Sequence, residues 1–261
     1  MKLSPASNTR LTLLRKLYRK KYRQKEQLFI IEGERAVLQV IKNGLIRVDS
    51  LYFDEKSNFF DEPDWEAAIA QVESFNIEST TFREIADTDN PQGVLALCEV
   101  PPESMVQDLA GAQGIIVATD GLQDPGNMGT IIRTASWFGA KGILAGKGSV
   151  DLFNPKVVRS TAGATGSLPY LNADLDADLP LFEQQGWKVV LLDAGPGARE
   201  LRSAEKTGKT ILVVGNEANG IRSSLADGRI KTRISSPVSS PRVESLNASI
   251  ALSIALYAFS G

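Results

Sequence analysis

Five polar side chains that could orient or stabilise a reacting group lie in three separate stretches of the sequence, residues 120–133, 210–221 and 234–249. Each stretch follows or contains an apolar run and leads toward a turn or helix, which indicates a strand-to-helix junction. In open α/β sheets this end of the strands is where ligands bind. The candidate residues are Asn127, Arg133, Glu217, Ser245 and Asn247. Together they predict one site at the carboxyl ends of parallel strands.

Taken singly, each stretch also has an ordinary structural explanation. Asp124 is a plausible N-cap, and Pro125 suits the first helical position because its missing N–H costs nothing there. Asn219-Gly220 is a common turn pair, and Ser245 is a good N-cap for the last helix. Only the combination of the three stretches favours a functional site.

The absence of histidine limits the chemistry available to these side chains. The chain of 261 residues has no histidine and a single cysteine, Cys98. Ser–His–Asp triads, Cys–His pairs and the usual zinc sites are therefore excluded, and no disulfide can form within the chain. Cys98 lies in the apolar run 93–100, which indicates a buried strand residue. No metal is expected at the site.

The glycines do not form a common nucleotide-binding loop. Gly139, Gly142, Gly146 and Gly148 lack the spacing of a dinucleotide fingerprint, and no P-loop pattern occurs. A small-molecule reductase on a doubly wound sheet is therefore a weak alternative.

Basic residues are concentrated at the start of the chain. Residues 1–48 contain twelve Lys and Arg and three acids, so this part carries +9 and the remainder of a chain of net charge −2 carries −11. Residues 10–25 hold eight cations and no acid, with leucine and tyrosine at helical spacing between them, which predicts one amphipathic helix. Such a face favours contact with nucleic-acid phosphates over a merely solvated surface. The predicted contacts are Arg10, Arg15, Lys16, Arg19, Lys20 and Arg23.

Alternating apolar strands and amphipathic helices predict two α/β domains. Residues 1–100 form a small domain, residues 101–112 a linker that begins Pro101-Pro102, and residues 113–261 a mostly parallel sheet with helices on both faces. In the first domain we expect strands at 28–33, 50–53, 77–82 and 93–100 and helices at 34–43 and 64–74. In the second we expect strands at 115–119, 142–145, 187–193, 210–215 and 232–235 and helices at 127–138, 154–160, 178–185 and 246–259.

The three stretches resemble the three motifs of the SpoU (TrmH-like) RNA 2′-O-methyltransferases of the SPOUT superfamily. The resemblance covers nearly the whole chain, because residues 8–37 are also similar to the L30e-like substrate-binding domain that is common in this family. The matching positions are Asp124, Pro125, Asn127, Gly129, Arg133 and Ala135 in the first motif, Gly215, Glu217 and Gly220 in the second, and Glu244 to Asn247 in the third.

The resemblance implies transfer of a methyl group from S-adenosylmethionine to a ribose 2′-hydroxyl, in a fold that ends in a deep trefoil knot. It implies a homodimer whose sites take residues from both chains, with no metal. It places Arg133 on the acceptor side, where a guanidinium that stays protonated suits a cationic clamp better than a base. Asn127, Ser245 and Asn247 would orient Arg133 and the ribose, and Glu217 would fix its turn or pair with Arg133. The implied cofactor contacts are Gly215, Ile234, Pro237 and Leu246.

One departure from the family pattern lies in residues 235–242, which are polar and lack the usual glycine. This loop favours an alternative in which the chain is a non-catalytic RNA-binding or ribosome-assembly protein. The intact polar residues of the motifs count against that alternative. Ribosomal RNA is the expected substrate, by analogy with relatives that have a separate amino-terminal domain, and transfer RNA is the alternative. The first thirty residues lack the apolar core of a signal peptide, so a cytoplasmic protein without a membrane span is expected.

Overall fold

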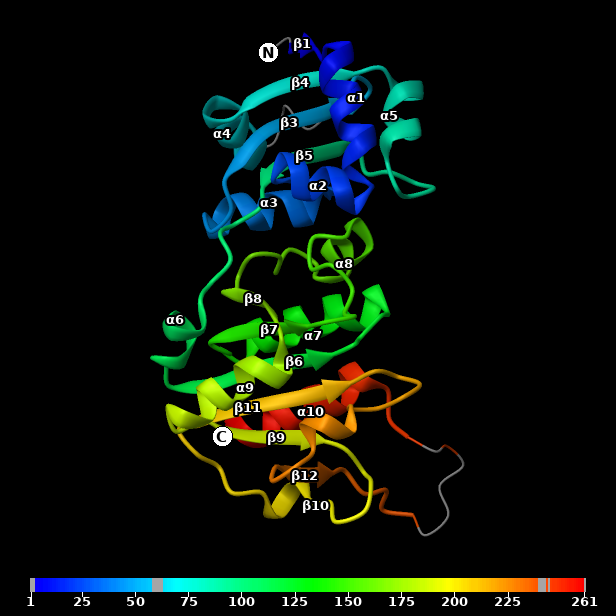
Figure 1. Ribbon diagram of the computed structural model, residues 1–261. Helices are drawn as coiled ribbons and strands as arrows, with labels where there is room; N and C mark the ends of the chain where they lie inside the picture. Colours follow the sequence, from blue (N-terminus) through cyan, green and yellow to red (C-terminus); the bar gives the residue numbers. More distant parts are fainter. Residues whose placement is uncertain (1–2, 58–62, 239–242, 244, 261) are drawn as a thin grey trace. The chain divides into compact units, whose positions relative to one another are not determined.

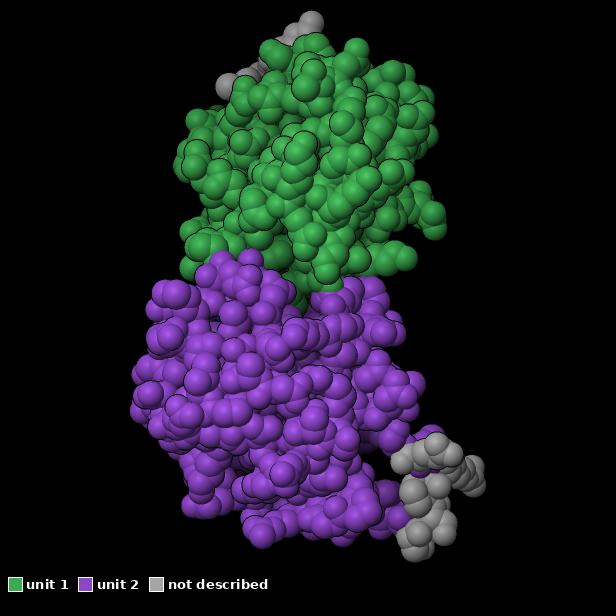
Figure 2. Space-filling view, in the orientation of Figure 1, with its two compact units in different colours: residues 1–102, 151–167 green, residues 103–150, 168–261 purple. Residues whose placement is uncertain are grey.

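The computed structural model describes residues 3–57, 63–238, 243 and 245–260. These fall into two compact units (Figure 2). The first comprises Met1–Pro102 and Asp151–Ser167, and the second comprises Glu103–Val150 and Leu168–Gly261. The segment 151–167, which the sequence assigned to the carboxyl-terminal domain, thus belongs to the first unit. The domain division itself stays a prediction.

The first unit is built on a five-stranded sheet in the order β1-β4-β3-β5-β2. Strand β5 runs antiparallel to both of its neighbours, and the remaining pairs are parallel. Leu14, Leu17, Tyr52, Phe82 and Leu95 belong to a core cluster on this sheet. The strands are β1 (Ser4–Pro5), β2 (Leu28–Glu32), β3 (Val48–Asp54), β4 (Glu73–Ile77) and β5 (Val94–Glu99), and the helices are α1 (Asn8–Leu17), α2 (Lys20–Glu26), α3 (Glu34–Asn43), α4 (Pro63–Gln71), α5 (Ser79–Ile85) and α8 (Pro155–Ser160).

The basic segment forms two helices, α1 and α2, where one was predicted. The chain leaves helical geometry at Arg19, whose φ of −99° and ψ of 127° are extended. Leu14 and Leu17 are buried by α1, whereas the buried residue of α2 is Arg23. The Arg23 guanidinium donates through Nη1 to the carbonyl of Leu17, at 2.8 Å, and so satisfies a backbone group at the end of α1. The break turns α2 so that this arginine faces inward.

The predicted strand at 77–82 is wrong, because β4 ends at Ile77 and α5 follows at Ser79. Phe82 and Ile85 are both buried. Residues three apart share a helix face, so α5 packs both side chains into one core. Cys98 is buried in β5, as predicted.

The second unit is a seven-stranded sheet in the order β10-β12-β9-β11-β6-β7-β8, and every neighbouring pair is parallel. Figure 1 shows α10 behind β11 and α9 in front of the sheet, so the predicted layered parallel sheet is confirmed. The knot stays a prediction. The strands are β6 (Gly114–Asp120), β7 (Gly142–Gly146), β8 (Tyr170–Ala173), β9 (Lys188–Leu192), β10 (Arg199–Glu200), β11 (Lys209–Gly215) and β12 (Ile230–Arg233), and the α-helices are α6 (Val106–Ala110), α7 (Pro125–Trp137), α9 (Leu175–Gln184) and α10 (Ala248–Ser260).

The two helices that begin at the candidate motifs start with side-chain caps. The Asp124 carboxylate accepts from the backbone N–H of Asn127 at 2.7 Å, and Pro125 opens α7, both as predicted. Helix α10 begins at Ala248, later than the predicted 246. The Asn247 amide oxygen accepts from the backbone N–H groups of Ser249 and Ile250, so Asn247 fills the capping role that the sequence suggested for Ser245.

Candidate active site

A tight turn follows β11 and presents Glu217. Asn216 and Gly220 exchange two backbone hydrogen bonds, at 3.0 and 2.9 Å, and Gly220 adopts a φ of +66°. A Cβ on Gly215 would lie 2.3 Å from the carbonyl carbon of Gly220, which no ordinary packing permits. The close return of the chain therefore requires glycine at position 215, and it holds the turn in one conformation.

Glu217 and the first and third motifs meet in one hydrogen-bonded cluster. The Asn127 amide donates to Oε1 of Glu217 at 2.9 Å, and its own oxygen accepts from the Asn247 amide at 2.9 Å. Three stretches far apart in the sequence are thus joined through a single side chain, Asn127. We call Asn127, Glu217, Asn247 and Ser249 the amide cluster.

Ser249 is the member of the amide cluster that the sequence did not single out. Its hydroxyl lies 2.7 Å from the side-chain oxygen of Asn247 and 3.2 Å from that of Asn127, and the residue is 4% exposed. A serine on the buried side of an otherwise apolar helix is the signal that could have indicated it, since buried hydroxyls need partners.

Arg133 and Ser245 lie outside the amide cluster. Arg133 is exposed on α7 and forms no ion pair with any described residue. Glu217 is hydrogen-bonded to Asn127 instead of pairing with Arg133. Arg133 follows Asn127 by six residues, which turns it toward a different side of the helix. Trp137, one turn further along the same face, is 84% exposed. Ser245 is also exposed.

The residues expected to contact the cofactor end β11 or lie between β12 and α10. Gly215 is buried, Ile234 is half-buried and Pro237 is exposed. Leu246 is 44% exposed, and nearby in sequence Val238 is 57% exposed. Residues 239–242 and Glu244 lie outside the described residues. The described part of this region thus offers uncovered apolar side chains close in sequence to Asn247.

The predicted phosphate contacts divide into exposed and engaged residues. Lys16, Arg19 and Lys20 are exposed, and Arg15 is exposed beside Glu84, at 3.3 Å. Arg10 is half-buried, donates to Glu73 at 2.6 Å and stacks 4.1 Å from the centre of the Phe75 ring.

Arg23, a predicted phosphate contact, is buried. It is 3% exposed and donates through Nε and Nη2 to Oδ2 of Asp151, at 3.1 and 2.6 Å. A guanidinium so enclosed has no access to an RNA phosphate. Its charge is needed inside the unit, where it balances a carboxylate that is largely removed from water.

The described residues include no group of three or more acidic or cysteine side chains placed to hold a metal ion. Across the same residues, every helix is too short or too polar to cross a bilayer.

Two family models match the chain. Residues 114–257 match the model of the SpoU rRNA Methylase family, and residues 8–96 match an MRM3-like substrate binding domain. The chain is 31% identical to the 23S rRNA (guanosine(2553)-2′-O)-methyltransferase RlmP of Bacillus subtilis, over 99% of both chains. It is 30% identical to the 23S rRNA (guanosine-2′-O-)-methyltransferase RlmB of Ralstonia nicotianae, over 87% of this chain and 93% of the relative.

Among solved structures, the AdoMet-bound rRNA methyltransferase from Sinorhizobium meliloti superposes with a TM-score of 0.83. It is 27% identical, and the match covers 98% of this chain and 95% of that one. The full-length match extends through both compact units. The chain belongs to the SpoU rRNA Methylase family, as its three motifs predict.

Proposed function

We propose that this protein transfers a methyl group from S-adenosylmethionine to a ribose 2′-hydroxyl of ribosomal RNA, in the cytoplasm. The observation that carries the proposal is the amide cluster, in which Asn127 joins Glu217 to Asn247. RlmP and RlmB, the two relatives described above, are named as 23S rRNA methyltransferases, which favours ribosomal over transfer RNA. Membership of a methylase family confirms the predicted enzyme class, and S-adenosylmethionine is the cofactor.

The residues near the end of β12 and before α10 suit an adenosyl group. Ile234, Val238 and Leu246 expose apolar surface there, and burying such surface against a purine ring is favourable. Gly215 ends β11, which β9 separates from β12 in the sheet, and the tight turn that follows Gly215 lies at the same edge. These residues would hold the cofactor, which supplies a methyl group made electrophilic by its sulfonium.

The chain's own task is to position a poorly acidic hydroxyl and to stabilise it as it loses its proton. The amide cluster provides the positioning. Asn127 is fixed on both sides of its amide, and Asn247 is tied both to Asn127 and to the first turn of α10. Side chains held in this way can present a single geometry to a ribose. Arg133 provides the positive charge that an incipient alkoxide and an adjacent phosphate require, because arginine stays protonated.

We infer that the enzyme is a homodimer and that Arg133 acts in its partner's site. In its own chain Arg133 stands on an exposed face of α7 beside Trp137. Helix α10 packs on α7, and its exposed side also carries large apolar side chains. They are Ile250, Ile254 and Tyr257, at 48%, 38% and 73% exposure. An apolar surface of this kind on two packed helices is typical of a subunit interface. We call Trp137, Ile250, Ile254 and Tyr257 the apolar helix face.

The apolar helix face begins one turn beyond Asn247. Two copies that bury it against each other would bring Arg133 of one chain toward the amide cluster of the other. This explains why Glu217 pairs with Asn127 while Arg133 stays without an ionic partner among the described residues of its own chain.

We propose that the first domain, residues 1–100, binds the RNA. Lys16, Arg19 and Lys20 support this role, because they are exposed cations with no ion pair among the described residues. Arg15 can exchange its exposed pair with Glu84 for a phosphate, since exposed pairs add little net stability. Arg10 is held by Glu73, and Arg23 is enclosed, so neither belongs to the proposed surface.

The proposal is tested by incubating the purified protein with radiolabelled S-adenosylmethionine and ribosomal RNA transcribed in vitro. We expect label at a 2′-O position, and Arg133→Ala should lower kcat by about 100-fold or more, as loss of a charge-stabilising donor does. Calorimetry should find the affinity for S-adenosylmethionine unchanged in that variant. Cofactor binding without methyl transfer by the wild type to any RNA would favour a non-catalytic RNA-binding protein.

A further inference from the structure

A polar pocket of about 690 Å³ opens at the carboxyl ends of β6, β7 and β11. Its lining includes Gln123, Lys147, Asn216, Asn219 and Arg222, and it excludes all four residues expected to contact the cofactor. The volume lies within the roughly 300–1,000 Å³ typical of ligand pockets. The turn 216–220 forms one wall, and this is the turn that presents Glu217 to Asn127. A ligand in the pocket would therefore lie next to the amide cluster.

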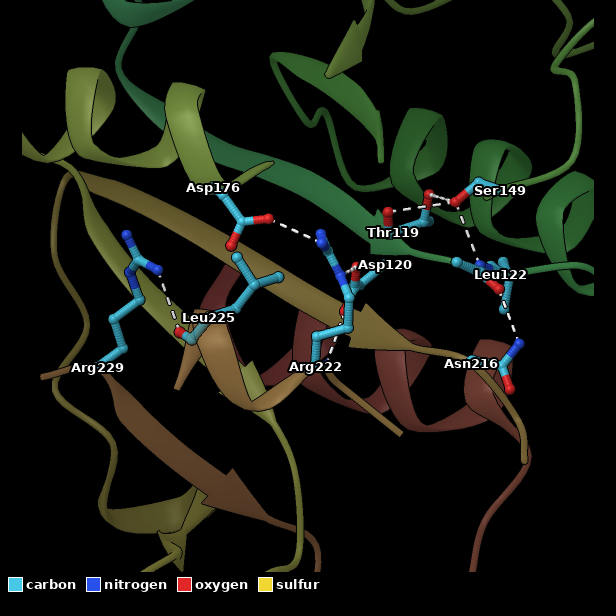
Figure 3. Close-up of polar contacts among 10 residues, drawn as sticks. Thr119, Asp120, Leu122, Ser149, Asp176, Asn216, Arg222, Leu225 and Arg229 are labelled. Carbon is cyan, nitrogen blue, oxygen red and sulfur yellow. Dashed lines mark hydrogen bonds and ion pairs between the residues drawn. The ribbon is translucent and has the colours of Figure 1, made fainter. Parts of the chain in front are cut away.

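Two carboxylates bind Arg222, one of the residues that line this pocket (Figure 3). Asp120, whose side chain is 1% exposed, accepts from the backbone N–H and the Nε of Arg222 at 2.8 and 2.7 Å. Asp176 accepts from Nη1 at 2.7 Å. Hydrogen bonding to Asp120 raises the pKa of Arg222, so the guanidinium stays charged.

One edge of the fixed guanidinium remains available. Nη2 of Arg222 has no hydrogen-bond partner among the described residues. The side chain is 44% exposed, so a ligand can reach this donor. Two carboxylates thus orient the cation and leave a donor directed elsewhere. A preoriented guanidinium of this kind suits a phosphate oxygen.

Lys147 offers a second cation that can move. Its ammonium contacts Asp174 at 2.5 Å, but the two side chains are 70% and 40% exposed. Exposed ion pairs add little net stability, because water competes with both partners. An anion entering the pocket can therefore draw Lys147 away from Asp174 at small cost. Arg222, anchored to a buried carboxylate, would stay in place.

The remaining polar groups suit the edge of a base. Gln123 and Asn219 are exposed amides, each able both to donate and to accept. Asn216 already donates to the carbonyl of Gly121 at 2.8 Å, so it supports the wall instead of binding a ligand. The described lining residues include no aromatic ring, which favours recognition by hydrogen bonds over stacking. Unstacked bases in single-stranded RNA are read in this manner.

We propose that this pocket binds a nucleotide that neighbours the methylated one in the RNA. Its phosphate would contact Lys147 and Nη2 of Arg222, and its base would contact Gln123 or Asn219. The inference rests on the proposed function, because only an RNA acceptor has a neighbouring nucleotide to offer. It assigns the pocket a role in selecting the position to be methylated.

The test compares Lys147→Ala and Gln123→Ala with Lys188→Ala. Lys188 is a matched control, because it too forms an ion pair with an exposed acid, Glu205, at 2.7 Å, but it begins β9 at the opposite end of the sheet. The probe is ribosomal RNA transcribed in vitro. Equilibrium binding of this RNA, KM and kcat are measured, together with the affinity for S-adenosylmethionine.

For Lys147→Ala we expect about fivefold weaker RNA binding and a loss of about 0.7 from the slope of log affinity against log salt, the contribution of one phosphate contact on a single strand. Gln123→Ala should raise KM without changing that slope. Lys188→Ala should match the wild type, and the affinity for S-adenosylmethionine should be unchanged throughout.

Four results would overturn the proposal. If Lys147→Ala leaves RNA binding unaltered, or if Lys188→Ala lowers it equally, Lys147 does not contact an RNA phosphate in the pocket. Weakened S-adenosylmethionine binding assigns the pocket to the cofactor. A free 5′-mononucleotide that binds through Lys147 while RNA binding is insensitive to this residue assigns it to a small ligand. Because RNA binding is measured without turnover, a wild type that binds RNA but transfers no methyl group would contradict only the proposed function.

Discussion

At the scale of single residues, the amide cluster depends on Asn127, whose side chain connects all three motifs. Its amide nitrogen donates to Glu217, and its amide oxygen accepts from Asn247 and Ser249. Removing the partner on either side would free the amide to rotate. The proposed site would therefore be sensitive to groups that need not touch the substrate, and Glu217 is the clearest example.

Glu217→Ala should lower kcat by roughly 10- to 100-fold, because a hydrogen bond to a charged group contributes about 1.5–3 kcal/mol. The KM for RNA should change little. Glu217→Gln should retain most of the activity, since its amide oxygen can still accept from Asn127. Steady-state kinetics with both variants test this positioning role. Equal losses in Gln and Ala variants would instead mean that the negative charge itself is required.

Arg23→Ala should destabilise the protein by about 3–5 kcal/mol, because it leaves the partly buried Asp151 carboxylate without its counter-charge. Urea denaturation followed by circular dichroism measures this loss. Lys20→Ala is the neighbouring control, and its effect should stay within about 0.5 kcal/mol, as at other exposed positions. The double variant Arg23→Leu, Asp151→Leu should recover much of the stability. A stable Arg23→Ala protein with weakened RNA binding would restore this arginine to the RNA surface.

At the scale of elements, the sequence predicted best those parts that local chemistry determines. The cap at Asp124, the helix α3 and the apolar strand β11 all follow from a few adjacent residues. The short edge strand β8 has no such local signature, because it exists only where β7 offers a partner.

In the candidate site, too, the sequence predicted individual residues but not the contacts between them. The motifs identified Asn127, Glu217 and Asn247, but their mutual hydrogen bonds connect residues 90 and 120 positions apart in the sequence. The inward turn of Arg23 likewise depends on Asp151, 128 residues further on. Contacts of this range are determined by the packed fold and leave no mark in local spacing.

Gly215→Ala tests the turn that ends β11. The added Cβ would meet the Gly220 backbone at 2.3 Å, so the turn must open, at a cost of about 1–3 kcal/mol as in other overpacked sites. Because the same turn presents Glu217, methyl transfer should fall together with stability. Gly111→Ala is the control: its Cβ would find neighbours at 3.7 and 3.9 Å, an ordinary contact distance. A variant at Gly215 with full activity would show that the turn can move without disturbing Glu217.

At the scale of the whole molecule, charge and apolar surface are placed in different parts of the chain. The positive residues are concentrated in the first 48 positions, whereas the apolar helix face lies on α7 and α10 of the second unit. This separation suits a protein that binds RNA with one unit and a second copy of itself with the other. Composition alone indicated RNA binding. The proposed dimer was implied only by family resemblance, because Ile250, Ile254 and Tyr257 are indistinguishable in sequence from core residues.

Mixed dimers decide whether Arg133 acts across the interface. Arg133→Ala and Asn247→Ala should each be nearly inactive alone. If each site combines Arg133 from one chain with Asn247 from the other, a heterodimer of the two variants contains one intact site and one doubly damaged site. Random exchange of subunits should then restore about a quarter of wild-type activity, since half of the dimers are mixed and each has one working site. Activity that stays at background after exchange, with heterodimers verified by two different affinity tags, would place Arg133 in its own chain's site.

Trp137→Glu supplies the control for this experiment. Because it puts a charge on the apolar helix face, it should lower dimerisation, measured by analytical ultracentrifugation, and abolish the restoration of activity.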